Sequence, residues 1–230
     1  VDELRRQGRE IADFTLGEPD MATPAHIARA GQDAIASGDI RYTSPNGRVG
    51  LRRAIANSLE LGLGVSYGMD QITVGAGAKQ IIGAALTASL EPGDEVIVCA
   101  PYWVSYPDMV LLNEGKPVVV TGPESQGFKL DAASLEAAIT PRTRWLILNS
   151  PSNPSGAVYS RAEMRALTEV LVRHPRVWIL SDEIYAPFCY GAEAHVSPVQ
   201  VEPRLAERTL IVNGMSKAYA MTGWRIGYGA

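Results

Sequence analysis

The sequence of 230 residues predicts an α/β protein with a mainly parallel sheet that helices cover on both faces. Two observations lead to this prediction. From residue 71 onward, short apolar and β-branched runs alternate with helical segments, as expected for buried strands joined by helices. Polar and turn-forming residues follow directly after these runs, at the edge where open α/β sheets bind their ligands. The length allows one large domain with a sizeable core, or two small domains.

Before residue 71 the sequence predicts helices joined by turns. The charged residues 1–6 are typical of a helix and do not form a signal peptide. A second helix is expected near residues 24–37, because Thr23 is a favoured N-cap residue and Pro24 suits the first turn. A third helix is expected over residues 48–61.

Glycines and short apolar runs define the remaining elements. Gly62 and Gly64 are expected to end the third helix. Strands are predicted over residues 72–74, 95–99, 117–121, 144–149, 177–182 and 208–212, with a further strand beginning near 226. Helices are predicted over residues 79–90, 106–113, 131–139 and 160–173, the last of them capped by Ser160.

Composition excludes several classes of protein. The net charge is −4 and no basic cluster is present, so nothing in the charge favours nucleic acid or an anionic membrane as a partner. No apolar run approaches the roughly 20 residues of a membrane span. Cys99 and Cys189 sit in apolar runs without metal-ligand spacing, and we expect both to be reduced core residues of a cytoplasmic protein. The chain opens without methionine and stops in a strand barely begun, so we expect a longer protein.

The residues after strand 208–212 suggest covalent chemistry. A small-residue turn presents Lys217, and Arg225 follows eight residues later. A lysine among small and apolar neighbours loses solvation of its charged form, so its pKa should fall and its amine become a nucleophile for aldehydes. An arginine can bind a phosphate with two parallel hydrogen bonds. Together they suggest pyridoxal phosphate, although a surface lysine and an unrelated arginine would give the same pattern.

A second candidate lies at Gly75-Ala-Gly-Ala-Lys79-Gln80, between a strand and a helix. Small residues there let backbone N–H groups approach an anion, which the helix N-terminus also favours. The Walker phosphate loop requires Ser or Thr after the lysine, and the dinucleotide loop requires a third glycine at position 80. Neither pattern is met, which leaves another kind of phosphate cup or a plain turn.

Three more strand ends carry candidate residues. Trp103 could stack on a flat ring or simply pack in the core. Asn153 could donate to a phenolate or carboxylate oxygen, or could be part of an ordinary turn. Asp182 ends an apolar strand, where a carboxylate needs a cation such as a protonated pyridine nitrogen, and Tyr185 follows it. A Walker B strand would also end in Asp-Glu, but the sequence has no Walker A loop.

Taken together, these segments resemble the fold type I pyridoxal-phosphate enzymes of the class I/II aminotransferases, and most closely the bacterial aspartate aminotransferases. The matching segments span nearly the whole chain in the family's order: Phe14-Thr-Leu-Gly17-Glu-Pro-Asp20, Ile40-Arg-Tyr42, 101–107, 149–156, 181–185 and 216–227. The resemblance implies a three-layer α/β/α domain with a mainly parallel seven-stranded sheet. Residues 1–45 would form an N-terminal arm and part of a small domain, and residues 46–230 an incomplete cofactor-binding large domain.

The resemblance also implies a role for each matching residue. Lys217 would carry the cofactor as a Schiff base and then act as the general base of the proton shift. Asp182 would pair with the pyridine nitrogen. Tyr185 and Asn153 would bind the ring oxygen, and Trp103 would stack on the ring.

The phosphate and the substrate have implied partners as well. The phosphate would be held by Gly77, Ala78, Lys79 and Arg225. Tyr42 would reach the phosphate of the neighbouring subunit, which makes the expected active form a homodimer. Gly17 and Asn153 would contact the substrate α-carboxylate, and Trp103 would also contact the substrate. No metal is expected.

The sequence departs from the family pattern in three places. Gly214 stands where the superfamily often has a phosphate-binding serine, so Ala78, Lys79 and Arg225 would carry more of the phosphate. The turn at 152–156 reads Ser-Asn-Pro-Ser-Gly rather than Asn-Asn-Pro-Thr-Gly. The family's arginine for the substrate α-carboxylate belongs to a region beyond residue 230.

The expected reaction moves an amino group from an L-amino acid, aspartate first, to a 2-oxo acid such as 2-oxoglutarate. Two alternatives remain. One is another enzyme on the same cofactor, such as a β-lyase or a cyclopropane-forming synthase. The other is the effector-sensing domain of a transcription regulator, which would need an attached DNA-binding segment.

Overall fold

The computed structural model describes residues 1–12 and 17–230. Within this part of the chain, seven strands form one sheet in the order β1-β7-β6-β5-β4-β2-β3. The strands are β1 (Thr73–Gly75), β2 (Glu95–Ala100), β3 (Lys116–Thr121), β4 (Thr143–Asn149), β5 (Trp178–Asp182), β6 (Thr209–Gly214) and β7 (Gly227–Gly229). Strands β2 to β6 pair in parallel, whereas β7 lies antiparallel between β1 and β6. The mainly parallel sheet predicted from the sequence is confirmed.

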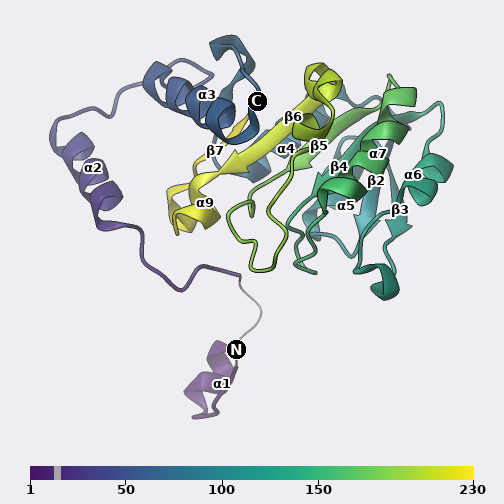
Figure 1. Ribbon diagram of the computed structural model, residues 1–230. Helices are drawn as coiled ribbons and strands as arrows, with labels where there is room; N and C mark the ends of the chain where they lie inside the picture. Colours follow the sequence, from purple (N-terminus) through teal and green to yellow (C-terminus); the bar gives the residue numbers. More distant parts are fainter. Residues whose placement is uncertain (13–16) are drawn as a thin grey trace.

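Helices cover both faces of this sheet (Figure 1). The described helices are α1 (Asp2–Arg6), α2 (Ala25–Ala36), α3 (Val49–Leu63), α4 (Ala78–Ser89), α5 (Ser105–Leu112), α6 (Ala132–Ala138), α7 (Arg161–Arg173), α8 (Pro198–Val201) and α9 (Met215–Ala218). Short 3-10 turns span 69–71, 124–126, 203–208 and 222–224. None of the helices in the described residues is long and apolar enough to span a membrane.

Alternation along the central strands divides the core between the two faces. In β4, Leu146 and Leu148 pack in the cluster that contains Leu167 and Leu171 of α7. Trp145 and Ile147 point to the other face and pack in the cluster of α4 and α5. Because successive side chains of a strand face opposite sides, the continuous apolar run of β4 buries both of its faces. A third cluster joins α3 to β6 and β7.

Some local expectations are confirmed and others are wrong. Ser160 caps α7 through a capping box with Glu163, as predicted. Thr23 does not cap α2, whose N-cap is Pro24; the Thr23 hydroxyl instead donates to the Ala220 carbonyl at 2.7 Å. Gly62 lies inside α3, and only Gly64, with φ 70°, ends that helix.

The two cysteines are less buried than expected, and part of the N-terminal arm lies outside the described residues. Both cysteines are free, but they are half-buried rather than fully in the core, and Cys189 lies in the loop after β5. Phe14, Thr15 and Leu16, which belong to one of the matching segments, lie outside the described residues.

Arg208 caps the C-terminal end of α7 from a distant part of the chain. Its guanidinium donates to the Leu171 carbonyl at 2.6 Å, to the His174 carbonyl at 3.2 Å and to the Val177 carbonyl. The last carbonyls of a helix have no partner within the helix, so a cation there satisfies them and interacts favourably with the helix dipole. The contact also ties α7 to the start of β6.

We expect Arg208→Met to lower the free energy of unfolding by about 2–3 kcal/mol, because several partly buried carbonyls lose a charged donor. Arg204→Met is the matched control, because its exposed side chain pairs with Glu202 and an exposed ion pair contributes little to stability. Urea unfolding of the three proteins measures the difference. Equal losses in both variants would show that Arg208 is not a specific cap.

Gly227 allows β7 to lie against the N-terminus of α4. A Cβ at this position would lie 2.2 Å from the Ala78 nitrogen and 2.3 Å from the Gly77 carbonyl carbon. Both atoms belong to the backbone, so neither can move without moving the helix. The close approach therefore depends on the absence of a side chain.

Gly227→Ala should lower the free energy of unfolding by about 1–3 kcal/mol, as overpacking does in other cores. Gly83→Ala, inside α4, is the control because its Cβ meets no atom within 4 Å. It should stabilise the protein by up to about 1 kcal/mol, since alanine is the better helix former. Thermal and urea unfolding would reveal the opposite signs, and a stabilising Gly227→Ala would contradict the packing described.

Candidate active site

A cleft of about 810 Å³ opens at the carboxyl edge of the sheet. Its walls come from the ends of β4 and β5, the start of α4, the segment after β2, the turn around α9 and the N-terminal segment. Among the predicted site residues, the cleft is lined by Gly17, Ala78, Lys79, Trp103, Asn153, Asp182, Tyr185, Lys217 and Arg225. The structure thus brings together residues that the sequence places at five separate strand ends.

Asp182 lies at the base of this cleft as the last residue of β5, and only 4% of it is exposed. The Tyr106 hydroxyl donates to Asp182 Oδ2 at 2.6 Å, and the Ile184 amide donates to Oδ1 at 3.2 Å. Burial still raises the pKa of Asp182 to about 6, since the two hydrogen bonds offset it only in part. No described cation contributes to this pKa, so the carboxylate is buried without a positive partner.

Tyr106 is a site residue to which the sequence analysis assigned no role. It lies in α5, 76 residues before Asp182, and only 2% of it is exposed, which raises its pKa. Burial is the main cause of that rise and the negative charge of Asp182 adds to it. The phenol therefore stays protonated and acts as a donor to Asp182. Its position three residues after Trp103, at the same strand end, was the available signal.

Lys217 lies in α9, the short helix that follows β6, and is half-buried. Its Nζ donates to the Gly17 carbonyl at 2.5 Å and lies 5.9 Å from the centre of the Tyr185 ring. Burial lowers the pKa of Lys217; the charge of Glu18 acts in the opposite direction, and that of Arg225 lowers it further. The cleft is therefore lined by a lysine whose pKa is lowered, the direction that its neighbours in the sequence predict.

The N-terminal segment also contacts the turn that carries Lys217 and Arg225. The Thr222 hydroxyl donates to Glu18 Oε1 at 2.6 Å. A Cβ on Gly31 of α2 would lie 2.7 Å from the Trp224 ring, so helix and indole are in close contact. Glu18 and Thr222 were not identified from the sequence, because nothing local indicates a contact across 204 positions.

An anion cradle is formed where α4 begins beside Arg225. Gly77 is the N-cap of α4 with φ 85°, and it offers no side chain to the first amides of the helix. The Arg225 guanidinium lies so close to Gly77 that a Cβ there would be 2.2 Å from Nη2. Arg225 is held by the Thr222 carbonyl, to which its Nη1 donates at 2.9 Å. Free amides, a helix dipole and a guanidinium converge, which suits a phosphate.

Trp103 and Lys79 form the wall beside this cradle. Trp103 packs edge-on against Tyr106, with ring centres 5.3 Å apart, and Lys79 Nζ lies 5.1 Å from the Trp103 ring centre. The indole is half-buried and lines the cleft, which agrees with stacking on a ligand better than with full burial in the core.

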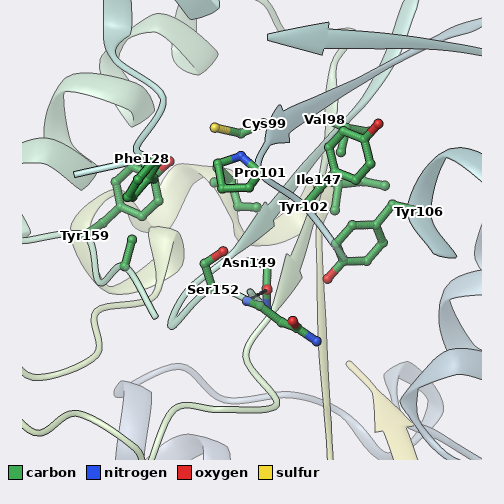
Figure 2. A pocket seen from close by; sticks show the side chains of 13 residues that line it. Val98, Cys99, Pro101, Tyr102, Tyr106, Phe128, Ile147, Asn149, Ser152 and Tyr159 are labelled. Atoms are coloured by element: carbon green, nitrogen blue, oxygen red, sulfur yellow. Dashed lines mark hydrogen bonds between the residues drawn. The ribbon is translucent and has the colours of Figure 1, made fainter. Parts of the chain in front are cut away.

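Asn153 and Tyr185 meet across the cleft. Burial raises the pKa of Tyr185, and the charge of Asp182 adds to this, while a hydrogen bond from Asn153 acts in the opposite direction. Asn153 also lines a small cavity of about 20 Å³ behind the cleft, together with Asn149, Ser152 and Tyr106 (Figure 2). Side chains from β2, β4 and the turn after β4 therefore line this cavity together.

These residues fit pyridoxal phosphate. The buried Asp182 lacks the cation that a protonated pyridine nitrogen would provide. Lys217 offers an amine for the aldehyde, and the cradle at Gly77, Ala78 and Arg225 offers partners for the phosphate. Two predicted residues, Gly77 and Tyr42, do not line the cleft of their own chain: Gly77 lies beside it as the N-cap of α4, whereas Tyr42 is fully exposed.

Comparison with known proteins agrees with this arrangement. The family model described as aminotransferase class I and II matches residues 9–230. The aspartate aminotransferase of Rhizobium meliloti is 54% identical over 225 residues, which cover 98% of this chain and 55% of that protein. The aspartate/prephenate aminotransferase of Cereibacter sphaeroides is 54% identical over 228 residues, covering 99% of this chain and 57% of that protein.

Solved structures give the same result. The crystal structure of the Rhizobium meliloti aspartate aminotransferase matches with a TM-score of 0.96 at 53% identity, over 100% of this chain and 57% of that one. The Thermus thermophilus aspartate aminotransferase with maleate matches with a TM-score of 0.94 at 45% identity, over 99% and 58%. The chain thus spans a little over half the length of the relatives it matches. The fold, the residues around the cleft and these matches show that the chain belongs to the class I and II aminotransferase family.

Proposed function

We propose that the protein is a pyridoxal-phosphate-dependent aminotransferase that moves an amino group from an L-amino acid to a 2-oxo acid. The observation that carries this proposal is that the Lys217 amine and the uncompensated Asp182 carboxylate line one cleft. The anion cradle beside them provides a place for the cofactor phosphate. When bound, pyridoxal phosphate supplies an aldehyde for amines and a ring that withdraws electrons from the substrate Cα.

The chain's own residues hold and orient the cofactor. Asp182 keeps the ring nitrogen protonated, and the Tyr106 hydroxyl fixes the carboxylate that does so. Gly77, Ala78, Lys79 and Arg225 bind the phosphate. Trp103 would stack on the ring, and Asn153 and Tyr185 would donate to its phenolic oxygen.

Lys217 performs the proton transfer. Because burial lowers its pKa, a larger fraction of the amine is unprotonated near neutral pH and can accept the substrate Cα proton at Nζ. The protonated Nζ would then be the proton donor for the second half of the transfer. Gly17, whose carbonyl accepts from Nζ, and Asn153 contact the substrate α-carboxylate.

Aspartate is the favoured donor and 2-oxoglutarate a typical acceptor. Relatives at 44–54% identity are named aspartate/prephenate aminotransferases, so prephenate is a second acceptor to be tested. We further propose a cytoplasmic homodimer in which the exposed Tyr42 reaches the neighbouring phosphate. Residues 1–45 would be the arm and part of a small domain, and residues 46–230 the cofactor-binding domain.

The direct test incubates the full-length protein and its cofactor with aspartate and either 2-oxoglutarate or prephenate. We expect oxaloacetate to form together with the aminated acceptor in equal amounts. Release of ammonia and a 2-oxo acid without an acceptor would instead indicate a lyase. A protein that binds the cofactor but turns over no donor would indicate a sensing domain.

We expect Lys217→Ala to abolish covalent attachment of the cofactor, because no other predicted site amine occupies the position of its Nζ. After borohydride reduction, mass spectrometry should show the added mass of the cofactor on the wild-type chain and not on Lys217→Ala. Lys116→Ala, in the edge strand β3, is the control and should be labelled normally. Undiminished labelling of the Lys217 variant would overturn the assignment.

The pKa of Asp182 predicts a specific pH dependence of stability. Its value in the folded, cofactor-free protein is raised from 3.8 to about 6, so folding favours the protonated form. The stability that Asp182 contributes is complete below pH 4 and is lost as the pH rises through 6. Over this pH range the free energy of unfolding of the wild-type protein should fall by about 3 kcal/mol. Asp182→Asn should not show this fall.

Urea unfolding of the two cofactor-free proteins between pH 4 and 7.5 measures this difference. Bound cofactor should reverse this pH dependence of stability, because a cationic ring nitrogen stabilises the ionised carboxylate. Parallel pH profiles for the two proteins would show that Asp182 is not the titrating group.

A further inference from the structure

Asn149 connects two residues, Asn153 and Asp182, to which the proposed function assigns contacts with two different atoms of the cofactor ring. It is the last residue of β4, and it lies beside Asp182 in the parallel pairing of β4 with β5. Its Nδ2 donates to the main-chain carbonyl of Asp182 at 3.0 Å. Its Oδ1 accepts from the main-chain amide of Asn153 at 2.8 Å. One planar amide therefore touches the backbone of both residues.

The turn after β4 needs a side-chain contact of this kind to connect it to β5. It is closed on itself, since the Ser152 amide donates to the Ala157 carbonyl at 3.0 Å and the Gly156 amide to the Ser152 carbonyl at 2.8 Å. These bonds shape the turn but do not connect it to β5. The Ser150 amide reaches the Asp182 carbonyl at 3.3 Å, at the root of the turn. Asn149 extends this connection to Asn153, the residue that faces the ring oxygen.

We propose that Asn149 is a positioning residue that fixes the separation between Asn153 and Asp182. This proposal rests on the proposed function, in which Asn153 binds the ring oxygen and Asp182 binds the ring nitrogen. Because the ring is rigid, both contacts are made at full strength only if their separation matches the ring. A single amide bonded to both backbones sets that separation.

The cavity beside Asn149 allows substitutions that remove its hydrogen bonds selectively. The adjoining cavity of about 20 Å³ has room for about one water molecule, and Asn149, Ser152 and Asn153 are among the residues that line it. In Asn149→Ala a water can therefore enter in place of the amide, and the fold can persist while both hydrogen bonds are lost. Asn149→Asp keeps the shape and the acceptor for Asn153, but its second oxygen has no proton for the Asp182 carbonyl. Ser152→Ala is the matched control, because it lies in the same turn and lines the same cavity.

The first measurement uses cofactor-free protein and does not depend on the proposed function. Hydrogen exchange of the Asn153 amide should become at least about tenfold faster in Asn149→Ala. It should remain close to normal in Asn149→Asp and in Ser152→Ala. Unfolding by urea verifies that each variant is folded under the exchange conditions.

The second measurement titrates the proteins with pyridoxal phosphate. Asn149→Ala and Asn149→Asp should raise the Kd by about tenfold or more relative to Ser152→Ala, as expected for loss of one well-placed contact. In Asn149→Ala the pH midpoint of the visible band should also move upward by roughly half a unit, because a donor to the ring oxygen favours its anionic form. Loss of fold stability alone would not move this midpoint.

Two outcomes would overturn the inference. If the Asn153 amide exchanges equally in Asn149→Ala and Ser152→Ala, Asn149 does not hold the turn. If exchange changes but the Kd and the pH midpoint do not, the contact is structural only. In either case the proposed function survives, whereas an unmodified protein that binds no pyridoxal phosphate would contradict both proposals.

Discussion

The arrangement of the site depends on a carboxylate that is buried without a cation. Asp182 ends a strand of the central sheet, and a carboxylate in that position would be costly without compensation. The protein compensates only partly, with hydrogen bonds from Tyr106 and the Ile184 amide. The unmet requirement for a positive charge is what makes the cleft suitable for a protonated heterocycle. The other side chains in the cleft surround this one requirement.

The parallel sheet explains why these residues converge. Strands β2, β4, β5 and β6 run in the same direction, so the segments that follow them meet at one edge. Each strand contributes a different chemical group there: an indole after β2, an amide after β4, a carboxylate at the end of β5 and an amine after β6. Their order along the chain is unimportant, because the sheet arranges them by strand order. This is the same geometry that places ligands in other open α/β sheets.

Much of the fold and of the site could be predicted from the sequence because the signals are local. Buried strands appear as continuous apolar runs, and the site residues Trp103, Asn153 and Asp182 follow them directly. What could not be predicted are contacts between segments far apart in the chain. The Tyr106 bond to Asp182 and the Lys217 bond to Gly17 are of this kind. The failed cap at Thr23 has the same origin, since its hydroxyl is used by a distant carbonyl.

The place of β7 in the sheet has a consequence for the order in which the molecule can assemble. Among the strands of the described residues, β1 pairs with β7 alone, and Thr73 pairs with Gly229. While the chain leaves the ribosome, β1 and the start of α4 therefore have no sheet to join until β7 has been synthesised. Contacts of such high sequence separation form late and slowly. The anion cradle, made by Gly77 and Arg225, can therefore close only after β7 has been synthesised, long after Gly77 itself.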